Sequence, residues 1–146
     1  MKKIVVVVAS GYFDPIHSGH INYLREAKKL GDKLIVIVNN DEQAKLKKGH
    51  YFMPVKERAT ILKAIKYVDE VFVSIDTDKS VLKSLVKIKP DIFAVGVDNC
   101  KERLIEKKTC DKLGIKIVDR LAKHLINDPS LKQSSSAICQ IYLQRK

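Results

Sequence analysis

Residues 4–20 read IVVVVASGYFDPIHSGH, and the pattern of this segment indicates the class of fold. It opens with a continuous β-branched run from Ile4 to Val8, which is typical of a strand covered on both faces in a parallel sheet. A loop follows from Gly11, and Ser18 can cap a helix that runs from Gly19 to Leu30. A buried strand that passes through such a loop into a helix predicts an α/β fold.

The same alternation continues along the chain. Further strands are expected at residues 34–38, 71–73, 92–95 and 115–118, and helices at 54–66, 80–89, 102–113 and 134–144. Pro54 suits a first helical turn, Ser80 can cap the next helix, and Gly114 can end the one after it. Residues 39–52 predict a loop with a short helix. The chain is therefore expected to form a Rossmann-like, doubly wound sheet of about five parallel strands, in one domain over residues 1–146.

Charge and composition narrow the class of protein. The chain has 28 Lys and Arg against 17 Asp and Glu, a net charge of +11, which predicts an anionic partner. The lysines are spread out, so a solvated surface accounts for most of this excess and no basic arm is expected. Cys100, Cys110 and Cys139 form no CxxC motif and predict free thiols in a reducing cytosol. No run approaches the ~20 apolar residues of a membrane span.

The candidate site lies between the first strand and the first helix. In doubly wound sheets ligands bind at the carboxyl ends of the strands, and a helix N-terminus attracts anions. His17 and His20 are three residues apart, so both rings can face one phosphate if the first turn begins near His17. Gly11 and Gly19 lack side chains where a nucleotide would approach the backbone.

The stretch from Gly11 to His20 resembles the GxFDxxHxGH signature of the cytidylyltransferase-like nucleotidylyltransferases. The resemblance covers nearly the whole chain, and its other matching segments are residues 30–36, Lys47-Lys48-Gly49 with Arg58, residues 67–71, and residues 134–138. The chain is similar to heptose-1-phosphate adenylyltransferases, glycerol-3-phosphate cytidylyltransferases and archaeal FAD synthetases. The family fold implied is the same Rossmann-like sheet.

This resemblance implies a reaction in which a substrate phosphate attacks the α-phosphorus of ATP or CTP and pyrophosphate leaves. Such a transfer depends on positioning and on stabilising negative charge. The catalytic residues implied are His17 and His20 together with Lys47 or Lys48, between which the sequence does not choose. Arg58 suits the substrate phosphate, because a guanidinium is a planar fork of donors.

The nucleotide-binding residues implied by the resemblance come from four segments. They are Gly11, Tyr12, Phe13, Asp14, Gly19, Gly96, Asp98, Ser134, Ser135 and Ser136. Asp14 is also a candidate to contact the substrate, to orient a histidine or to help hold Mg²⁺. No metal site built from protein ligands alone is expected, since Mg²⁺ is held through the phosphates.

The loop at residues 95–99 and the segment 121–132 depart from the relatives, and the second lacks the arginine of glycerol-phosphate enzymes. These departures favour ATP over CTP. The first interpretation is an adenylyltransferase acting on a sugar phosphate, as in lipopolysaccharide core biosynthesis. The alternatives are a glycerol-3-phosphate cytidylyltransferase or an FAD synthetase.

Two alternatives are not enzymes. One is a basic nucleotide- or RNA-binding module, which the 6% aromatic content and the lack of an anticodon-binding extension argue against. The other is a regulator that has lost catalysis, which the intact histidines and lysines argue against. The expected partners are a nucleoside triphosphate and a phosphorylated acceptor, without nucleic acid or membrane. A cytoplasmic homodimer is expected by analogy.

Overall fold

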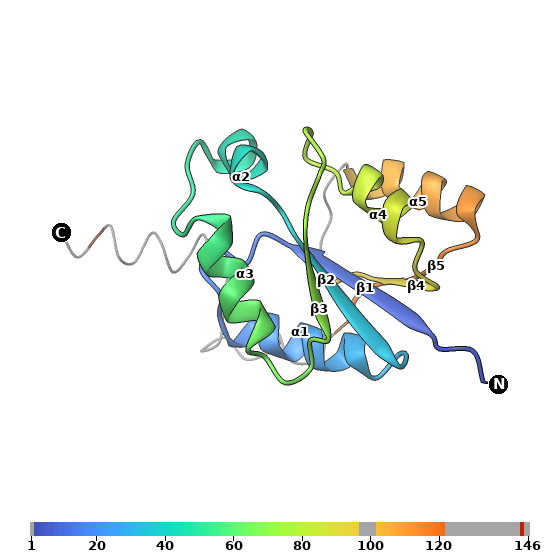
Figure 1. Cartoon of the computed structure of the whole chain (residues 1–146). Helices are drawn as coiled ribbons and strands as arrows, with labels where there is room; N and C mark the ends of the chain where they lie inside the picture. The colour runs from blue at the N-terminus through green and yellow to red at the C-terminus, as the bar shows by residue number, and fades with distance from the viewer. Residues whose placement is uncertain (1, 97–101, 122–143, 145–146) are drawn as a thin grey trace.

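The chain folds around a five-stranded parallel sheet with the strand order β3-β2-β1-β4-β5 (Figure 1). The computed structural model describes residues 2–96, 102–121 and 144. The strands are β1 Val6–Gly11, β2 Lys33–Val38, β3 Glu70–Val73, β4 Ile92–Ala94 and β5 Lys116–Val118. The helices are α1 Ser18–Lys28, α2 Asp41–Lys48, α3 Val55–Lys63, α4 Leu82–Ile88 and α5 Glu102–Leu113. The predicted doubly wound α/β architecture is confirmed.

Local differences from the predicted elements have simple causes. The first strand begins at Val6, two residues later than expected, and the N–H of Val5 just before it donates to the carboxylate of Asp32. His17, not Ser18, is the N-cap of α1. Ser80 is not the N-cap of α4, which is Val81, although Oγ of Ser80 accepts from the N–H of Leu82 at 3.4 Å. The buried carboxylate of Asp76 accepts from the next two N–H groups of that helix, those of Lys83 and Ser84. The helix predicted at 134–144 lies outside the described residues, apart from its last residue.

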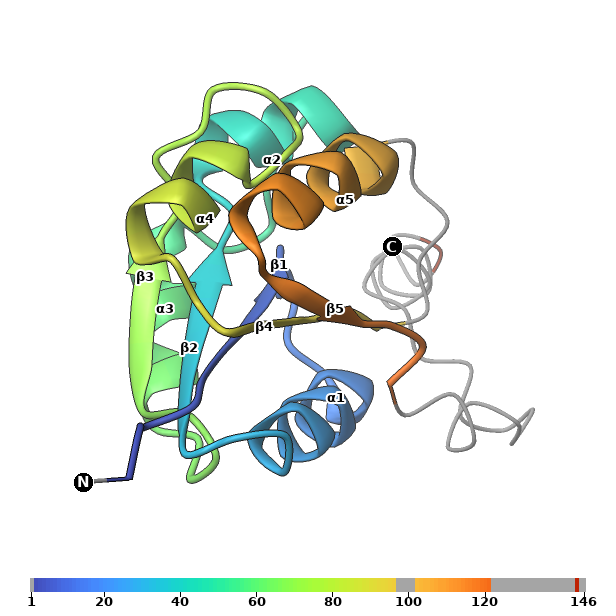
Figure 2. The ribbon, with the colours of Figure 1, turned by 90° about the vertical axis from the view of Figure 1, so that its right-hand side faces the viewer.

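Alternating side chains of the central strands build two separate cores. On one face of the sheet, Val7 and Val36 pack with α1 and α3. On the other face, Val8 and Ile35 pack with α4 and α5. Figure 2 shows this layering, with α4 and α5 on one side of the sheet and α1 on the other. Because both faces are covered, the central strands β1 and β2 are largely apolar, as the sequence predicts.

The strand order reverses between β1 and β4. After β3 the chain crosses through α4 to the other side of β1, so the loops that leave β1 and β4 lead to opposite faces. Tyr23 of α1 joins these two strands at their carboxyl ends. Its hydroxyl accepts from the N–H of Ser10 at 3.3 Å and donates to the carbonyl of Ala94 at 2.5 Å. The start of α1 is thereby fixed at the point where doubly wound sheets bind ligands.

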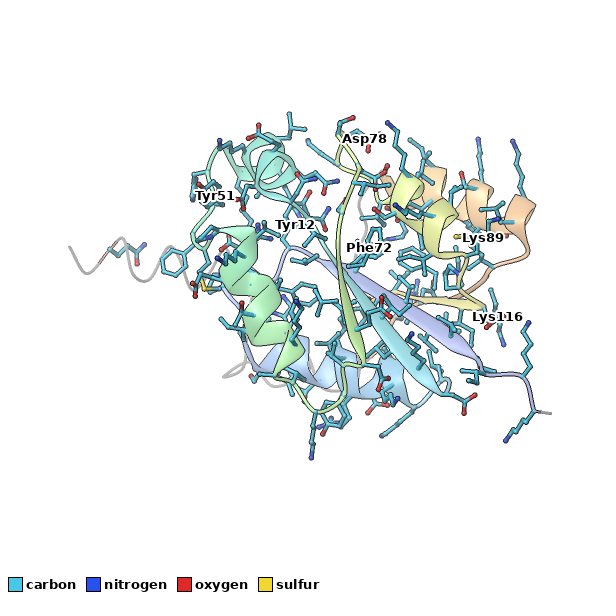
Figure 3. The ribbon with its side chains drawn as sticks, in the orientation of Figure 1. Tyr12, Tyr51, Phe72, Asp78, Lys89 and Lys116 are labelled. Atoms are coloured by element: carbon cyan, nitrogen blue, oxygen red, sulfur yellow. The ribbon has the colours of Figure 1, made fainter. Side chains whose placement is uncertain are left out.

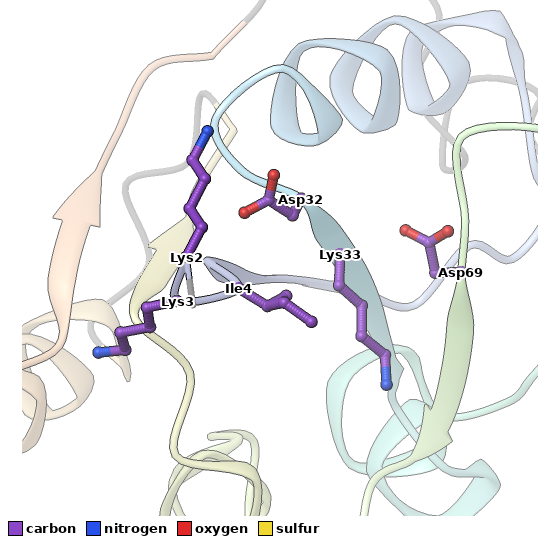
Figure 4. Close-up of a pocket in the computed structure, with 6 residues that line it drawn as sticks. All are labelled: Lys2, Lys3, Ile4, Asp32, Lys33 and Asp69. Atoms are coloured by element: carbon purple, nitrogen blue, oxygen red, sulfur yellow. The ribbon is translucent and has the colours of Figure 1, made fainter.

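Aspartates accept hydrogen bonds at the amino ends of the strands, opposite the carboxyl ends that Tyr23 joins. The N–H of Val6 lowers the pKa of the Asp91 carboxyl that accepts its hydrogen bond, and the ammonium of Lys3 lowers it further. A shallow hollow of about 490 Å³ lies at this edge, and Figure 4 shows the lysines and aspartates around it. Asp69, one of its lining residues, is paired with Lys28 at 2.6 Å. These charges stabilise the amino ends of the strands. They lie at the opposite end of the sheet from the switch point, the place at the carboxyl ends of β1 and β4 where the strand order reverses.

Candidate active site

The first turn of α1 places His17 and His20 together. Nδ1 of His17 accepts a hydrogen bond from the N–H of Gly19 at 3.1 Å, as expected of an N-cap residue. Nδ1 of His20 accepts from the N–H of His17, also at 3.1 Å. The two rings stack with centroids 3.8 Å apart and planes 24° apart. The three-residue spacing therefore brings both rings to the end of the helix that attracts anions.

These hydrogen bonds fix the tautomer of both imidazoles. A neutral imidazole has one donor and one acceptor nitrogen, and since Nδ1 accepts in both rings, Nε2 carries the proton. Burial lowers the pKa of His17. Burial, then His17, then the ammonium of Lys48 lower the pKa of His20 to about 3. Near neutral pH the site thus offers two neutral Nε2–H donors.

Phe13 packs against His20 from the loop that follows β1. Their ring centroids are 4.9 Å apart, and Phe13 is buried. Its backbone has φ of 53°, in the left-handed region that bulky residues rarely adopt. A Cβ atom on Gly11 would lie 3.1 Å from this ring. The missing side chain at Gly11 therefore makes room for Phe13, whereas the sequence alone suggested an approach by the nucleotide.

Asp14 joins this loop to the segment between α2 and α3. It is only 1% exposed, and its carboxylate accepts from the N–H of Phe52 at 2.7 Å and from that of Met53 at 2.6 Å. A carboxylate buried in this way is not presented to a substrate or to a bound cation. The expectation that Asp14 contacts substrate, orients a histidine or holds Mg²⁺ finds no support in these contacts.

The two candidate lysines have different surroundings. Nζ of Lys48 donates to the backbone carbonyl of Asp14 at 3.1 Å, and its charge acts on His20. Nζ of Lys47 instead lies 4.4 Å from the centre of the Tyr12 ring, a cation–π geometry. Both lysines come from the last turn of α2. The structure therefore brings Lys48 toward the histidine pair, while Lys47 packs on Tyr12.

Arg58 is fully buried in the first turns of α3, with no exposed side-chain surface. Its guanidinium donates to four acceptors, which are the carbonyls of Met53, Tyr12 and Asn39 and the carboxylate of Asp41. These acceptors belong to the loops that follow β1 and β2, to the first residue of α2 and to the segment that joins α2 to α3. Arg58 therefore joins these segments around the site, and a substrate phosphate has no access to it in this structure.

Other candidate residues lie at the switch point or outside the described residues. Gly96 lies two residues after the end of β4, where a Cβ atom would meet the Tyr23 ring at an ordinary distance of 3.7 Å. Gly19 is in the first turn of α1. Asp98 and Ser134, Ser135 and Ser136 are not among the described residues. The role of Tyr23 in joining β1 to β4 is missed by sequence reasoning, because a tyrosine inside an amphipathic helix carries no local signal of it.

Within residues 2–96 and 102–121, no three His, Cys, Asp or Glu side chains form a group that could hold a metal ion. The contacts of Asp14 do not fit such a role either. No helix in the described portion has the length and apolar character needed to cross a membrane.

Comparisons with known proteins identify the family of the chain. The family model described as "Cytidylyltransferase-like" matches residues 8–141. The chain is 38% identical to the FAD synthase of Thermococcus kodakarensis, with 99% of this chain and 93% of the relative covered. It is 42% identical to the FAD synthase of Pyrococcus abyssi, over 76% of this chain and 75% of the relative.

A solved structure is also similar. It is described as the lipopolysaccharide core biosynthesis protein from Thermoplasma volcanium, with a TM-score of 0.70 and 36% sequence identity. The match covers 81% of this chain and 97% of that one. The likeness therefore extends over most of both chains.

Proposed function

Because this chain belongs to the cytidylyltransferase-like family and is a nucleotidyltransferase, we propose that it transfers AMP from ATP to flavin mononucleotide, forming FAD and pyrophosphate. The observation that carries this proposal is the 38% identity to an FAD synthase along 99% of the chain. The sequence alone favours a sugar phosphate as acceptor. The relatives named FAD synthase support the flavin alternative better.

In the proposed reaction, a phosphate oxygen of flavin mononucleotide attacks the α-phosphorus of ATP. The bond from that phosphorus to the oxygen bridging the α- and β-phosphates breaks, and pyrophosphate leaves with the electron pair. The new bond is the diphosphate link of FAD. The reaction needs no side-chain nucleophile, so the protein acts by orienting the reactants and by stabilising negative charge.

The geometry of His17 and His20 suits this task. Their Nε2–H groups are donors on adjacent, stacked rings, and each ring is held through Nδ1 by the backbone of α1. Preorganised donors of this kind stabilise charge as it develops on phosphate oxygens. Lys48 adds a positive charge beside His20. Its anchor on the carbonyl of Asp14 limits how far this ammonium can move.

The direct test is to incubate the purified chain with MgATP and flavin mononucleotide and to measure FAD by chromatography together with released pyrophosphate. The proposal expects the two products in equal amounts. Parallel reactions replace ATP with CTP, or the flavin with sugar 1-phosphates or glycerol 3-phosphate. Pyrophosphate release that depends on another acceptor, without FAD formation, would overturn the assignment of the acceptor but not of the enzyme class.

A sugar-phosphate adenylyltransferase is the second candidate, favoured by the description of the similar Thermoplasma volcanium structure. The panel of acceptors separates the two. A basic RNA-binding module would instead show tight RNA binding that weakens steeply with salt. We carry forward a homodimer and a cytoplasmic location as proposals from the family resemblance. Light scattering tests the first of them.

A further inference from the structure

Asp14 contacts the segment between α2 and α3 through both its carboxylate and its backbone. The carboxylate accepts from the N–H groups of Phe52 at 2.7 Å and Met53 at 2.6 Å, one to each oxygen. The backbone carbonyl accepts from Nζ of Lys48 at 3.1 Å. The span from Lys48 to Met53 therefore begins and ends on one residue of the loop that follows β1. Within this span Gly49, with φ of 81°, is the C-cap of α2.

The loop that carries Asp14 also supports the histidine pair. Phe13, the residue before it, packs on the ring of His20 with the two ring centroids 4.9 Å apart. Figure 3 shows this loop, marked by Tyr12, next to the span that follows α2, marked by Tyr51. The histidines and the lysine of the candidate site are thus supported by consecutive residues of one loop.

The side chain of Lys48 needs such support, because ordering a lysine side chain costs up to about 2 kcal/mol of conformational entropy. A charge that is placed before the reaction stabilises the transition state more than one that must be ordered during it. The contacts of Asp14 hold both the ammonium of Lys48 and the backbone that follows it. We infer that Asp14 is a positioning residue, whose carboxylate fixes the end of α2 so that Lys48 stands beside His20. This inference rests on the proposed role of Lys48 in the transfer.

A second set of contacts joins the same two segments. Arg58 donates to the carbonyls of Tyr12 and Met53, each at 2.8 Å. The segments should therefore stay together when the carboxylate of Asp14 is changed. Asp14→Asn replaces one carboxylate oxygen with an amide nitrogen that cannot accept, so one of the two N–H groups loses its acceptor. The variant should fold while holding the end of α2 less tightly.

Asp76 provides a matched control for this change. It is 3% exposed, against 1% for Asp14, and its carboxylate likewise accepts from two successive backbone N–H groups, those of Lys83 and Ser84. Those groups belong to α4, which packs on the face of the sheet opposite to α1. Asp76→Asn therefore makes the same chemical change at a buried carboxylate that supports a different helix.

The experiment measures kcat, MgATP affinity by calorimetry and the free energy of unfolding for Asp14→Asn, Asp76→Asn and Lys48→Met, and for each aspartate variant combined with Lys48→Met. We expect Asp14→Asn to lower kcat about tenfold and to weaken MgATP binding about threefold. In the Lys48→Met background it should change either value by less than about twofold, because residues that act as a unit are not additive. Asp76→Asn should lower the free energy of unfolding but change kcat by less than about twofold in both backgrounds.

A second variant separates the position of the carboxylate from its charge. Asp14→Glu keeps the charge and moves the carboxylate by one methylene, so it should lower kcat as Asp14→Asn does and be equally silent in the Lys48→Met background. Charge alone predicts a different pattern. Removing a carboxylate near the triphosphate would then strengthen MgATP binding in Asp14→Asn, and Asp14→Glu would match the wild type. Asp14→Glu also carries the test if Asp14→Asn does not fold.

Each outcome bears on the inference. If the Asp14 variants are destabilised but keep the wild-type kcat and MgATP affinity, or if their effects add fully to that of Lys48→Met, Asp14 is only a structural support and the inference is refuted. Tighter MgATP binding by Asp14→Asn would refute it in favour of the charge. A chain in which MgATP binding shows the non-additive pair, but which forms no FAD, would refute the proposed function and leave the positioning role intact.

Discussion

The backbone N–H of His17 donates to Nδ1 of His20 at 3.1 Å, so each histidine of the pair helps to hold the other in place. His17 has two separable roles in this arrangement. Its Nδ1 caps α1 by accepting from Gly19, and its Nε2–H is directed away from the cap as a donor. A substitution that keeps one role and removes the other can therefore show which role catalysis needs.

His17→Asn makes this separation, because asparagine is a strong N-cap residue but has no donor at the position of Nε2. We expect the free energy of unfolding to change by less than about 1 kcal/mol. Turnover should fall by about two orders of magnitude, the usual effect of removing one preorganised donor. Chemical denaturation and steady-state assays check the two values. Turnover close to that of the wild type would show that the cap alone matters.

The dependence of the free energy of unfolding on pH below 6.5 provides a second prediction. The pKa of His20 is about 3 in the folded chain, against 6.5 ordinarily, so between these values the unfolded chain binds the additional proton. Stability should therefore rise with pH through this window, by at most about 1.4 kcal/mol per pH unit, and stop rising above 6.5 on this account. Urea titrations at several pH values measure this slope.

His20→Gln is the matched control for that slope. Glutamine at the third helical position can still accept from the N–H of the N-cap residue, as in a capping box, but it does not titrate. The variant should have a shallower dependence of stability on pH between 3 and 6.5. An unchanged slope would assign the acid sensitivity to other groups. The same pKa shift predicts that kcat/KM of the wild type shows no inflection near pH 6.5 caused by His20.

The same substitution at the neighbouring residues Lys47 and Lys48 tests which of the two lysines acts in the reaction. We expect Lys48→Met to lower turnover by tenfold or more, because it removes the positive charge beside His20 from the proposed phosphate site. Lys47→Met should change turnover by less than about threefold, since Nζ of Lys47 lies over the Tyr12 ring and a methionine can keep an apolar contact there. Equal effects, or a larger effect at Lys47, would contradict this assignment.

The sequence could predict features that depend on local pattern. Val7 and Val8 belong to a continuous apolar run, which indicates a strand between two helical layers, and the structure has them in opposite cores. The spacing of His17 and His20 predicts that their rings can share one side of a helix, and the rings are stacked. Serine is favoured over histidine as an N-cap residue, so the sequence predicts Ser18 at the start of this helix. In the structure His17 is the N-cap, and its Nδ1 atom accepts the capping hydrogen bond.

Contacts between distant segments could not be predicted in this way. Asp14 accepts from a backbone group 38 residues further along the chain, and Arg58 donates to a carbonyl 46 residues before it. In the sequence, a carboxylate and a guanidinium beside a phosphate motif look like ligands, because their chemistry suits phosphate and Mg²⁺. Only the folded chain shows that the Asp14 carboxylate accepts from backbone N–H groups, and that the Arg58 guanidinium donates to backbone carbonyls and to the Asp41 carboxylate.

The buried guanidinium supports a final prediction, which distinguishes a ligand from an internal support. If Arg58 binds the substrate phosphate, Arg58→Met should raise KM for the acceptor strongly and affect stability little. Its four hydrogen bonds and its complete burial predict the reverse. Removing one partner of a buried ion pair costs about 3–5 kcal/mol, and the lower end of this range applies here because the Asp41 side chain is 28% exposed. We expect Arg58→Met to lower the free energy of unfolding by about that amount.

Asp41→Asn is the control for this test. It keeps the size of the side chain while removing the charge that pairs with Arg58 at 2.7 Å, and it touches no proposed substrate contact. Its effect should be in the same direction but smaller, because asparagine still has an oxygen that accepts from the guanidinium. Assays at a temperature where both variants remain folded should give an acceptor KM within about threefold of the wild type, given that Arg58 is inaccessible. A large rise in that KM, confined to Arg58→Met in a stable variant, would return Arg58 to the substrate-binding residues.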